Sequence, residues 1–150
     1  MLIITVHGHP APQGSKRHVG RGVMVESSKK VKPWREAVKQ AALDQIEGPQ
    51  PPAFTTITGP VRARIQFVFN KPKSAPKRRK TWPITRSSGD VDKLLRSTFD
   101  ALTDAGIWRD DSQVVYVSAE KLYVGDDDTP LASPGAVIRL MAIPPLEVAR

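Results

Sequence analysis

The sequence predicts an α+β fold, in which a mixed sheet of about four strands packs with two main helices. Four apolar runs have the composition or the two-residue alternation of β-strands, and two other segments have the three- and four-residue spacing of helices. The chain has 150 residues, enough for one domain to bury a core without staples. We therefore expect residues 1–150 to form a single domain.

Four strands are expected. Met1–Val6 is β-branched and is broken by the sequence His7-Gly8-His9-Pro10. Pro60–Asn70 alternates, with apolar residues at odd positions on one face and Arg62, Arg64, Gln66 and Val68 on the other, which predicts a half-buried strand with exposed arginines. The other two strands are expected at Gln113–Tyr123 and Gly135–Ala142.

Two helices are expected. In Pro33–Glu47 the apolar residues recur at helical spacing, Pro33 suits the first turn and Gly48 suits the stop, with Trp34 as a core anchor. The second helix begins near Asp90 and has one apolar stripe that includes Leu94, Ala101 and Leu102. Gly106 then suits the position after its C-cap.

The charge is strongly segregated. The net charge is +8 and the pI is about 10.0. Arg62–Arg86 holds nine Lys and Arg and no acid, whereas Ser87–Asp128 holds ten acids against four bases. Such clustering of positive charge predicts a polyanionic ligand, and the 6% aromatic content argues against base stacking on an aromatic platform.

Several classes of protein are excluded or disfavoured. The chain has no cysteine, which excludes a disulfide scaffold and thiolate metal sites. It has no apolar run long enough to cross a bilayer and no P-loop, so we expect neither a membrane span nor a nucleotide cofactor. Met1 leads directly into an apolar run without a basic signal-peptide region, so a cytoplasmic location is expected.

Two basic segments are candidates for contact with the DNA backbone. Pro10–Lys32 combines glycines with basic residues and is interpreted as a loop or hairpin, and Lys71–Ser88 is a basic, proline-punctuated loop that we expect to face DNA. Simple solvated loops are the alternative. The candidate DNA-binding residues are Lys16, Arg17, Arg21, Lys71, Lys73, Lys77, Arg78, Arg79, Lys80, Arg86 and Lys93.

Asp90 and Asp92 form the first acidic pair, at the start of the second helix. N-capping and the helix dipole already explain acids there. However, two carboxylates about 4 Å apart repel by roughly 4 kcal/mol at an effective dielectric near 20, and a divalent cation converts that repulsion into attraction. Carboxylates that hold a cation beside a basic surface are what a metal-dependent nuclease needs.

A second acidic pair, Asp110-Asp111, precedes the third strand. A helix from Asp90 to Ala105 is roughly 22 Å long, and the five steps from Gly106 to Asp111 reach at most roughly 17 Å. Asp111 therefore meets Asp90 only if the helix ends early or the chain folds back alongside it; otherwise it serves a site elsewhere, including one across a dimer interface. The sequence leaves these options open.

Three other charged features remain. Arg96 and Lys93 can neutralise a scissile phosphate, although Arg96 also lies four residues after Asp92, the spacing of a plain salt bridge. Asp126-Asp127-Asp128 lacks the spacing of a calcium loop and is interpreted as a solvated turn.

Three stretches together resemble the RusA-type Holliday-junction resolvases of bacteria and phages. They are Asp90-Val91-Asp92-Lys93-Leu94, then Phe99–Trp108 (FDALTDAGIW), then Asp110–Val115 (DDSQVV), with Lys121 near the end of the strand. The match is dense over about a quarter of the chain.

This resemblance implies a homodimeric α+β endonuclease that requires Mg²⁺ or Mn²⁺ and nicks four-way DNA junctions symmetrically, in a bacterial cell or phage-infected host. The family's metal-binding aspartates fall on Asp90, Asp92 and Asp111, and a lysine important for cleavage falls on Arg96. That arginine keeps the charge but cannot titrate near neutral pH. Asp110 and Lys121 are site residues of undefined role.

Two alternatives to this function remain: a non-catalytic DNA-binding protein, and a metal nuclease that prefers flaps or other branched DNA.

Overall fold

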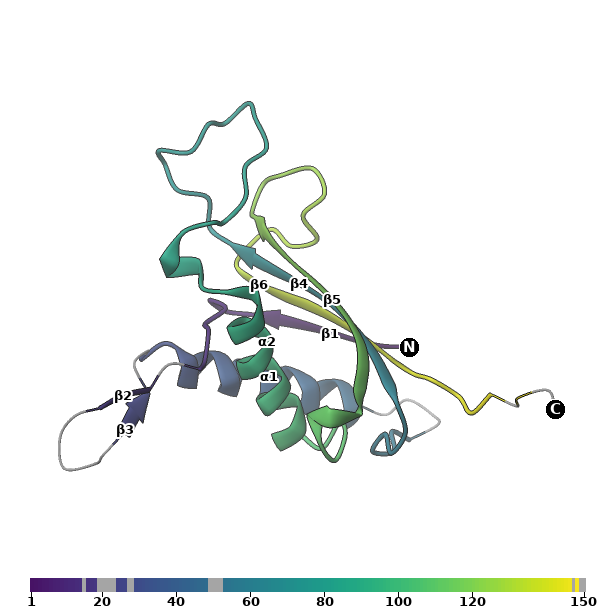
Figure 1. Cartoon of the computed structure of the whole chain (residues 1–150). Coiled ribbons are helices and arrows are strands. Elements are labelled where there is room, and N and C mark those ends of the chain that lie inside the picture. The colour runs from purple at the N-terminus through teal and green to yellow at the C-terminus, as the bar shows by residue number, and fades with distance from the viewer. Residues whose placement is uncertain (15, 19–23, 27–28, 49–52, 147, 149–150) are drawn as a thin grey trace.

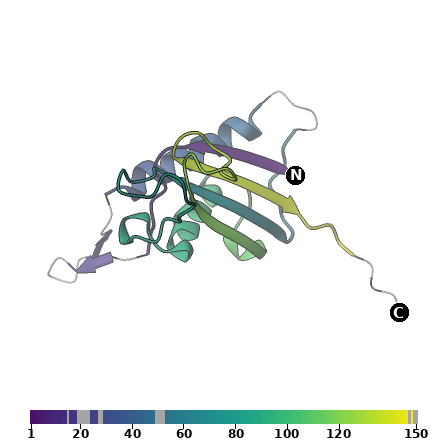
Figure 2. The same cartoon turned by 90° about the horizontal axis from the view of Figure 1, so that it is seen from above.

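The centre of the structure is a four-stranded mixed sheet with both long helices on one of its faces (Figures 1 and 2). The computed structural model describes residues 1–14, 16–18, 24–26, 29–48, 53–146 and 148. The sheet has the order β1-β6-β4-β5, in which only β4 and β5 are parallel. Its strands are β1 (Leu2–His7), β4 (Val61–Phe69), β5 (Val114–Tyr123) and β6 (Gly135–Ala142).

The predicted class is confirmed: a single α+β domain with a four-stranded mixed sheet and two helices. The helices are α1 (Val31–Ile46) and α2 (Val91–Asp104), and short 3₁₀ turns η1 (Arg86–Ser88) and η2 (Asp111–Gln113) precede α2 and β5. None of the helices in the described part of the chain is long and apolar enough to span a membrane.

The helices pack on the sheet through the apolar stripes that the sequence predicts. Trp34 of α1 is 1% exposed, as expected for a core anchor, and its indole N–H donates to the Thr98 hydroxyl of α2 at 3.2 Å. Ile65 and Phe67 of β4 are fully buried in the same core as Leu94 and Leu102 of α2. This core fixes α2 against the sheet.

The prediction that β4 is exposed on alternate residues is correct for Arg62 and Arg64 but wrong for Gln66 and Val68. Gln66 is 6% exposed because Arg139 donates to its amide oxygen at 2.7 Å and its amide nitrogen donates to Glu120 at 2.8 Å. Val68 is fully buried beside Leu122, its register partner on β5. This end of the open sheet face therefore carries a second, smaller buried cluster.

A small antiparallel hairpin extends from the body of the molecule before α1 (Figures 1 and 2). Its strands are β2 (Lys16–His18) and β3 (Met24–Glu26). The hairpin alternative is thus confirmed where Lys16–His18 pairs with Met24–Glu26. Arg21 lies outside the described residues.

Candidate functional site

Asp90 occupies the N-cap position of α2, but its carboxylate does not cap the helix. The backbone of Asp90 is extended (φ −77°, ψ 142°), as an N-cap requires, and its carbonyl accepts the first helical hydrogen bond from Leu94. The side chain accepts no capping hydrogen bond and is 70% exposed, with Lys93 Nζ 3.5 Å from Oδ2. Helix capping therefore does not account for this carboxylate.

Lys121 holds the turn from which Asp90 projects. Its ammonium donates to the Gly89 carbonyl at 2.7 Å and to the Ser88 hydroxyl at 3.0 Å. Burial lowers the pKa of Lys121, and the negative charge of Asp90 opposes that shift. Lys121 thus links the C-terminal half of β5 to the start of α2, a positioning role that the sequence did not define.

A strap formed by residues 11–14 fixes the other side of α2. The Ala11 carbonyl accepts from the Ser97 hydroxyl at 2.6 Å, and the Gln13 backbone N–H donates to the Lys93 carbonyl at 3.0 Å. The Gln13 side chain donates to Asp100 at 2.8 Å. The strap thus runs along α2 as far as Gly14, where an added Cβ would lie 3.2 Å from the side chains of Lys93 and Arg96.

The two aspartates of the second acidic pair have different environments. Asp110 is the N-cap of η2 and accepts from the Ser112 backbone N–H at 2.9 Å, and the hydrogen bonds from Ser112 lower its pKa. For Asp111, burial raises the pKa, and repulsion from Asp110 and Asp100 adds to the shift, against a smaller opposing effect of Arg96. Asp110 therefore caps η2, whereas the carboxylate of Asp111 has no capping role.

Gln113 holds the turn that presents Asp111. Its amide oxygen accepts from the backbone N–H groups of Arg109 and Asp110 at 2.9 and 3.1 Å. Its amide nitrogen donates to the carbonyls of Ile57 and Gly59 at 2.8 and 3.0 Å. One side chain thus ties the η2 turn to the segment before β4.

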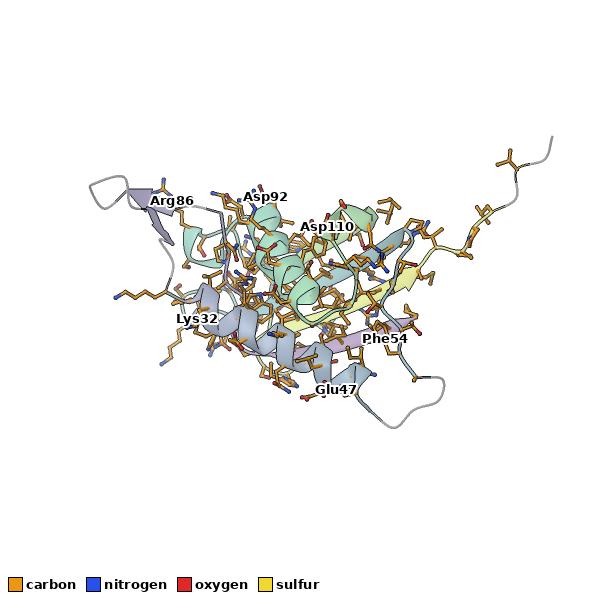
Figure 3. All side chains as sticks on the ribbon, turned by 90° about the horizontal axis from the view of Figure 1, so that it is seen from below. Lys32, Glu47, Phe54, Arg86, Asp92 and Asp110 are labelled. Atoms are coloured by element: carbon orange, nitrogen blue, oxygen red, sulfur yellow. The ribbon has the colours of Figure 1, made fainter. Side chains whose placement is uncertain are left out.

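The chain does fold back along α2, which was one of the two conditions under which the sequence allowed Asp111 to meet Asp90. Gly106 has φ +80°, and Trp108 then packs edge-on against Phe99 with ring centroids 5.5 Å apart. Asp111 consequently lies within electrostatic range of Arg96 and Asp100, in the middle of α2. Figure 3 shows Asp92 on α2 and Asp110 at the turn before β5.

A single chain does not assemble three metal ligands in the described part of the structure. Among these residues, no group of three or more His, Cys, Asp and Glu side chains could hold a metal ion. The alternative interpretation of Arg96 as a salt-bridge partner of Asp92 also lacks support, since the ion pairs found among the described residues do not include it.

The basic loop between β4 and α2 is attached to the turn that follows β5. Lys71 pairs with Asp126 at 3.1 Å, and Lys80 pairs with Asp128. Lys77, Arg78 and Arg79 line an open cleft of about 290 Å³ against the same turn. The interpretation of Asp126 as solvated was wrong: its side chain is 10% exposed, because Lys71 covers it.

The remaining candidate DNA-binding residues occupy different parts of the structure. Lys73, Arg78, Arg79 and Arg86 are exposed, and Lys93 stands on α2 beside Asp90. The backbones of Lys16 and Arg17 are in β2. The basic loop thus leads through η1 into the start of α2, whereas the hairpin extends away from the body of the molecule (Figure 1).

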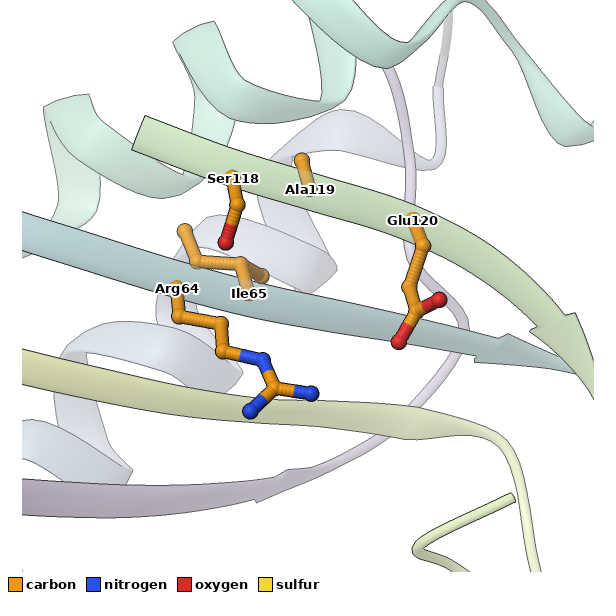
Figure 4. A pocket seen from close by; sticks show the side chains of 5 residues that line it. All are labelled: Arg64, Ile65, Ser118, Ala119 and Glu120. Carbon is orange, nitrogen blue, oxygen red and sulfur yellow. The ribbon is translucent and has the colours of Figure 1, made fainter. Parts of the chain in front are cut away.

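A separate hollow of about 210 Å³ lies on the open face of the sheet, between Arg64 of β4 and Ser118 and Glu120 of β5 (Figure 4). It is lined by none of the acidic residues from the two pairs. One of its polar residues, Glu120, accepts a hydrogen bond from Gln66, which in turn accepts one from Arg139. We interpret this hollow as a feature of sheet packing.

Comparison with protein families identifies the family of this chain. The family model of endodeoxyribonuclease RusA matches residues 7–130, more than four fifths of the chain. The chain belongs to the RusA endodeoxyribonuclease family. A search of curated individual proteins finds no match. The family match includes the strap, the basic loop, both acidic pairs and Lys121, so these features lie within a nuclease domain.

Several residues that shape this RusA-family site were not assigned a role from the sequence. Gln13 and Asp100 are 87 positions apart and meet only because the strap folds along α2. Gln113 was counted as part of a strand, whereas it ends η2 and holds the turn. Pro12 packs against Gly89, where a Cβ would lie 2.6 Å from the proline ring.

Gly89→Ala should displace Asp90. Gly89 has φ +83°, which is unfavourable for alanine, and the added methyl would collide with Pro12. We expect the variant to unfold at lower denaturant concentration and to lose activity on DNA. The matched control is Gly106→Ala, at φ +80° with nothing within 4 Å of its Cβ, which has the backbone strain without the collision. If both variants lose equal stability and activity, the contact with Pro12 does not position Asp90.

Asp111→Asn should raise the melting temperature of the metal-free protein at neutral pH. The folded-state pKa of Asp111 is raised, so folding disfavours its charged form, and this cost appears as the pH rises through that pKa. Well below 3.8 the substitution should have no such effect.

Asp110→Asn is the matched comparison, measured by thermal unfolding across the same pH range. The pKa of Asp110 is lowered, so its stabilising contribution is present at neutral pH and is lost on acidification. We expect this variant to be less stable than wild type at neutral pH. Equal melting temperatures for the two variants at every pH would contradict the different environments assigned to the pair.

Proposed function

We propose that the chain is a divalent-metal-dependent endonuclease that resolves four-way (Holliday) DNA junctions by paired symmetric nicks. The family match over residues 7–130 carries this proposal, because it covers both acidic pairs together with the basic segments around them. The exposed carboxylate of Asp90 supports it further, since that side chain does not perform the capping that its position offers.

In this proposal Asp90, Asp92 and Asp111 hold Mg²⁺, for which Mn²⁺ substitutes. Their carboxylate oxygens fit Mg²⁺, because hard divalent cations prefer oxygen ligands. Among the described residues, one chain does not bring three such side chains together. The metal, when bound, supplies a water of lowered pKa as the nucleophile at phosphorus. The roles of the protein's own residues follow from their positions.

Lys121 keeps Asp90 in place through the Gly89 carbonyl and the Ser88 hydroxyl. Arg96 offers a fixed positive charge to the phosphate that becomes more negative during cleavage, and it does not transfer a proton because guanidinium stays protonated. Lys93 places a second ammonium beside Asp90. These groups orient and neutralise the substrate.

The basic hairpin and the basic loop hold the DNA backbone on either side. A homodimer with two-fold symmetry would match the symmetry of a four-way junction and place one cleavage site on each of two opposed strands. Phosphate contacts of this kind give affinity and register without sequence information. Selectivity for a branch point then depends on the spacing of the two basic segments.

Asp90→Asn should abolish nicking while leaving junction binding intact. With Mg²⁺, we expect the cleavage rate to fall by about 100-fold or more, since the variant loses a metal ligand but no basic residue. The control is Asp104→Asn, on the same helix, which loses only the exposed pair with Arg35 and should cleave at the wild-type rate. Full cleavage by Asp90→Asn would exclude this assignment.

The substrate assay uses labelled four-way junction, flap and linear duplex, each with Mg²⁺ or EDTA, resolved on a denaturing gel. Symmetric nicks in the junction that require Mg²⁺ support the proposal. Preferential cleavage of flaps favours a different branched-DNA nuclease. Binding that is indifferent to Mg²⁺, with no nick in any substrate, favours a structural DNA-binding protein.

Arg79→Gln should weaken junction binding and reduce its salt dependence. Arg79 is exposed on the basic loop, and the loss of one phosphate contact should lower the slope of log K against log salt by about 1. Lys39→Gln makes the same charge change on α1, which lies away from the basic loop in Figure 1. Binding titrations at several salt concentrations check both; identical slopes for the two variants would remove Arg79 from the DNA interface.

A further inference from the structure

Two large apolar side chains are exposed on the basic loop just before the candidate site. Trp82 is 53% exposed, and Ile84, at 88%, is the most exposed large apolar residue among those that the structure describes. They flank Pro83, which is buried. Single apolar residues are common on protein surfaces, so the significance of this pair depends on what surrounds it.

The backbone that carries this pair is fastened to the start of α2. The Ser88 hydroxyl lies 2.7 Å from the Thr85 carbonyl and 3.1 Å from the Pro83 carbonyl, to which it donates, and its oxygen accepts from Lys121 at 3.0 Å. The Ser88 backbone N–H donates to the same Thr85 carbonyl at 3.1 Å. These contacts make residues 83–88 one compact turn that Lys121 fastens to β5.

The same contacts bring Trp82 and Ile84 close to Asp90. Ser88 and Asp90 are two residues apart, at most roughly 7 Å along the chain. Since the Pro83 carbonyl is 3.1 Å from the Ser88 hydroxyl, the backbone between the two apolar residues lies within roughly 15 Å of Asp90. That distance corresponds to roughly four base steps of a DNA strand.

The apolar pair is surrounded by positive charge. Residues 77–80 are consecutive cations that precede it, and Arg86 follows it. Lys80, which also pairs with Asp128, lies over the Trp82 ring with Nζ 5.1 Å from the ring centroid, so the ring is held beside these cations. Cations that contact phosphates would bring the apolar side chains against the bases between them.

An apolar side chain of this kind distinguishes a branch point from a continuous duplex. In linear DNA its insertion must break the stacking between two base pairs, whereas stacking is already interrupted where the arms of a junction meet. Phosphate contacts are available on both kinds of DNA and do not discriminate between them. One exposed ring suffices for insertion, so the low aromatic content, which argues against a platform of several rings, is compatible with it.

We propose that Trp82 and Ile84 form an apolar wedge that enters the branch point of four-way DNA and contacts its unstacked bases. This inference rests on the proposed function and deepens it, because it names residues that select branched over linear DNA. The wedge adds to the selectivity that the spacing of the basic segments gives. It also limits where the strand is cut, because the turn of residues 83–88 fixes the distance from the wedge to Asp90.

The tryptophan fluorescence of the protein tests insertion directly. The chain has three tryptophans, and Trp34 and Trp108 are each 1% exposed, so quenching by DNA reports on Trp82. With EDTA present to prevent cleavage, a saturating four-way junction should quench the emission more strongly than a saturating linear duplex. Trp82→Phe should abolish this difference. Equal quenching of wild type by the two DNAs would overturn the proposal.

Selectivity is tested by a variant that carries both Trp82→Ser and Ile84→Ser. Binding titrations in EDTA should show its affinity for the junction reduced by about 10-fold or more, with little change for the duplex, because stacking on bases is lost and the phosphate contacts remain. Both side chains are exposed, so the circular dichroism spectrum should match that of wild type. An equal loss of affinity for the two DNAs, or no loss for either, would overturn the proposal.

Two further variants serve as controls. Trp82→Phe keeps an aromatic ring and should retain most of the preference for the junction. Met141→Ala removes an apolar side chain that is 46% exposed where β6 pairs with Arg62, at the opposite end of the sheet from Lys121, and should bind both DNAs like wild type. A loss of junction preference in Met141→Ala equal to that in the double variant would contradict a role specific to the wedge.

Failure of the proposed function gives a different pattern. If wild type shows the junction-dependent quenching but nicks no DNA with Mg²⁺, the nuclease proposal fails and the wedge stands. If wild type nicks junctions while the double variant keeps the full preference for them, the nuclease proposal stands and the wedge is overturned.

Discussion

The candidate site depends on how the first turn of α2 is held. The Lys121 ammonium bonds to the Gly89 carbonyl and the Ser88 hydroxyl from the sheet side, and the strap bonds to Lys93 and Ser97 from the other side. With backbone and neighbouring side chains providing these contacts, the carboxylate of Asp90 is left exposed at the N-terminus of a helix. A negative side chain there is favoured by the helix dipole, which makes its position stable as well as accessible.

In the second acidic pair, Asp110 has a structural role and Asp111 does not. Asp110 accepts the capping hydrogen bond of η2, and Gln113 fastens the same turn to the chain before β4. Asp111 is then presented without a capping role, partly buried and close to other acids. Because the pKa of Asp111 is raised, its ionisation at neutral pH opposes folding. Adjacent residues of the same type thereby acquire different chemistry, Asp110 from its hydrogen bonds with Ser112 and Asp111 from burial and nearby acids.

Much of this architecture follows from local sequence patterns. The apolar stripe of α2, Gly106 after its C-cap, and the last strand are local features, and the structure has them where they were predicted. The contacts of Gln13 with Asp100 and of Lys121 with Gly89 were not predictable, because they depend on which distant segments the topology brings together. The burial of Gln66 and Asp126 has the same cause, since each is covered by a residue far away in the chain.

Binding of a divalent cation at the acidic start of α2, as we propose, can be measured by anomalous diffraction from a crystal soaked in Mn²⁺. We expect a manganese peak within coordination distance of the carboxylates of Asp90 and Asp92, with Asp111 as a further ligand. A well-ordered crystal with no peak near these oxygens, in one chain or between two, would contradict it.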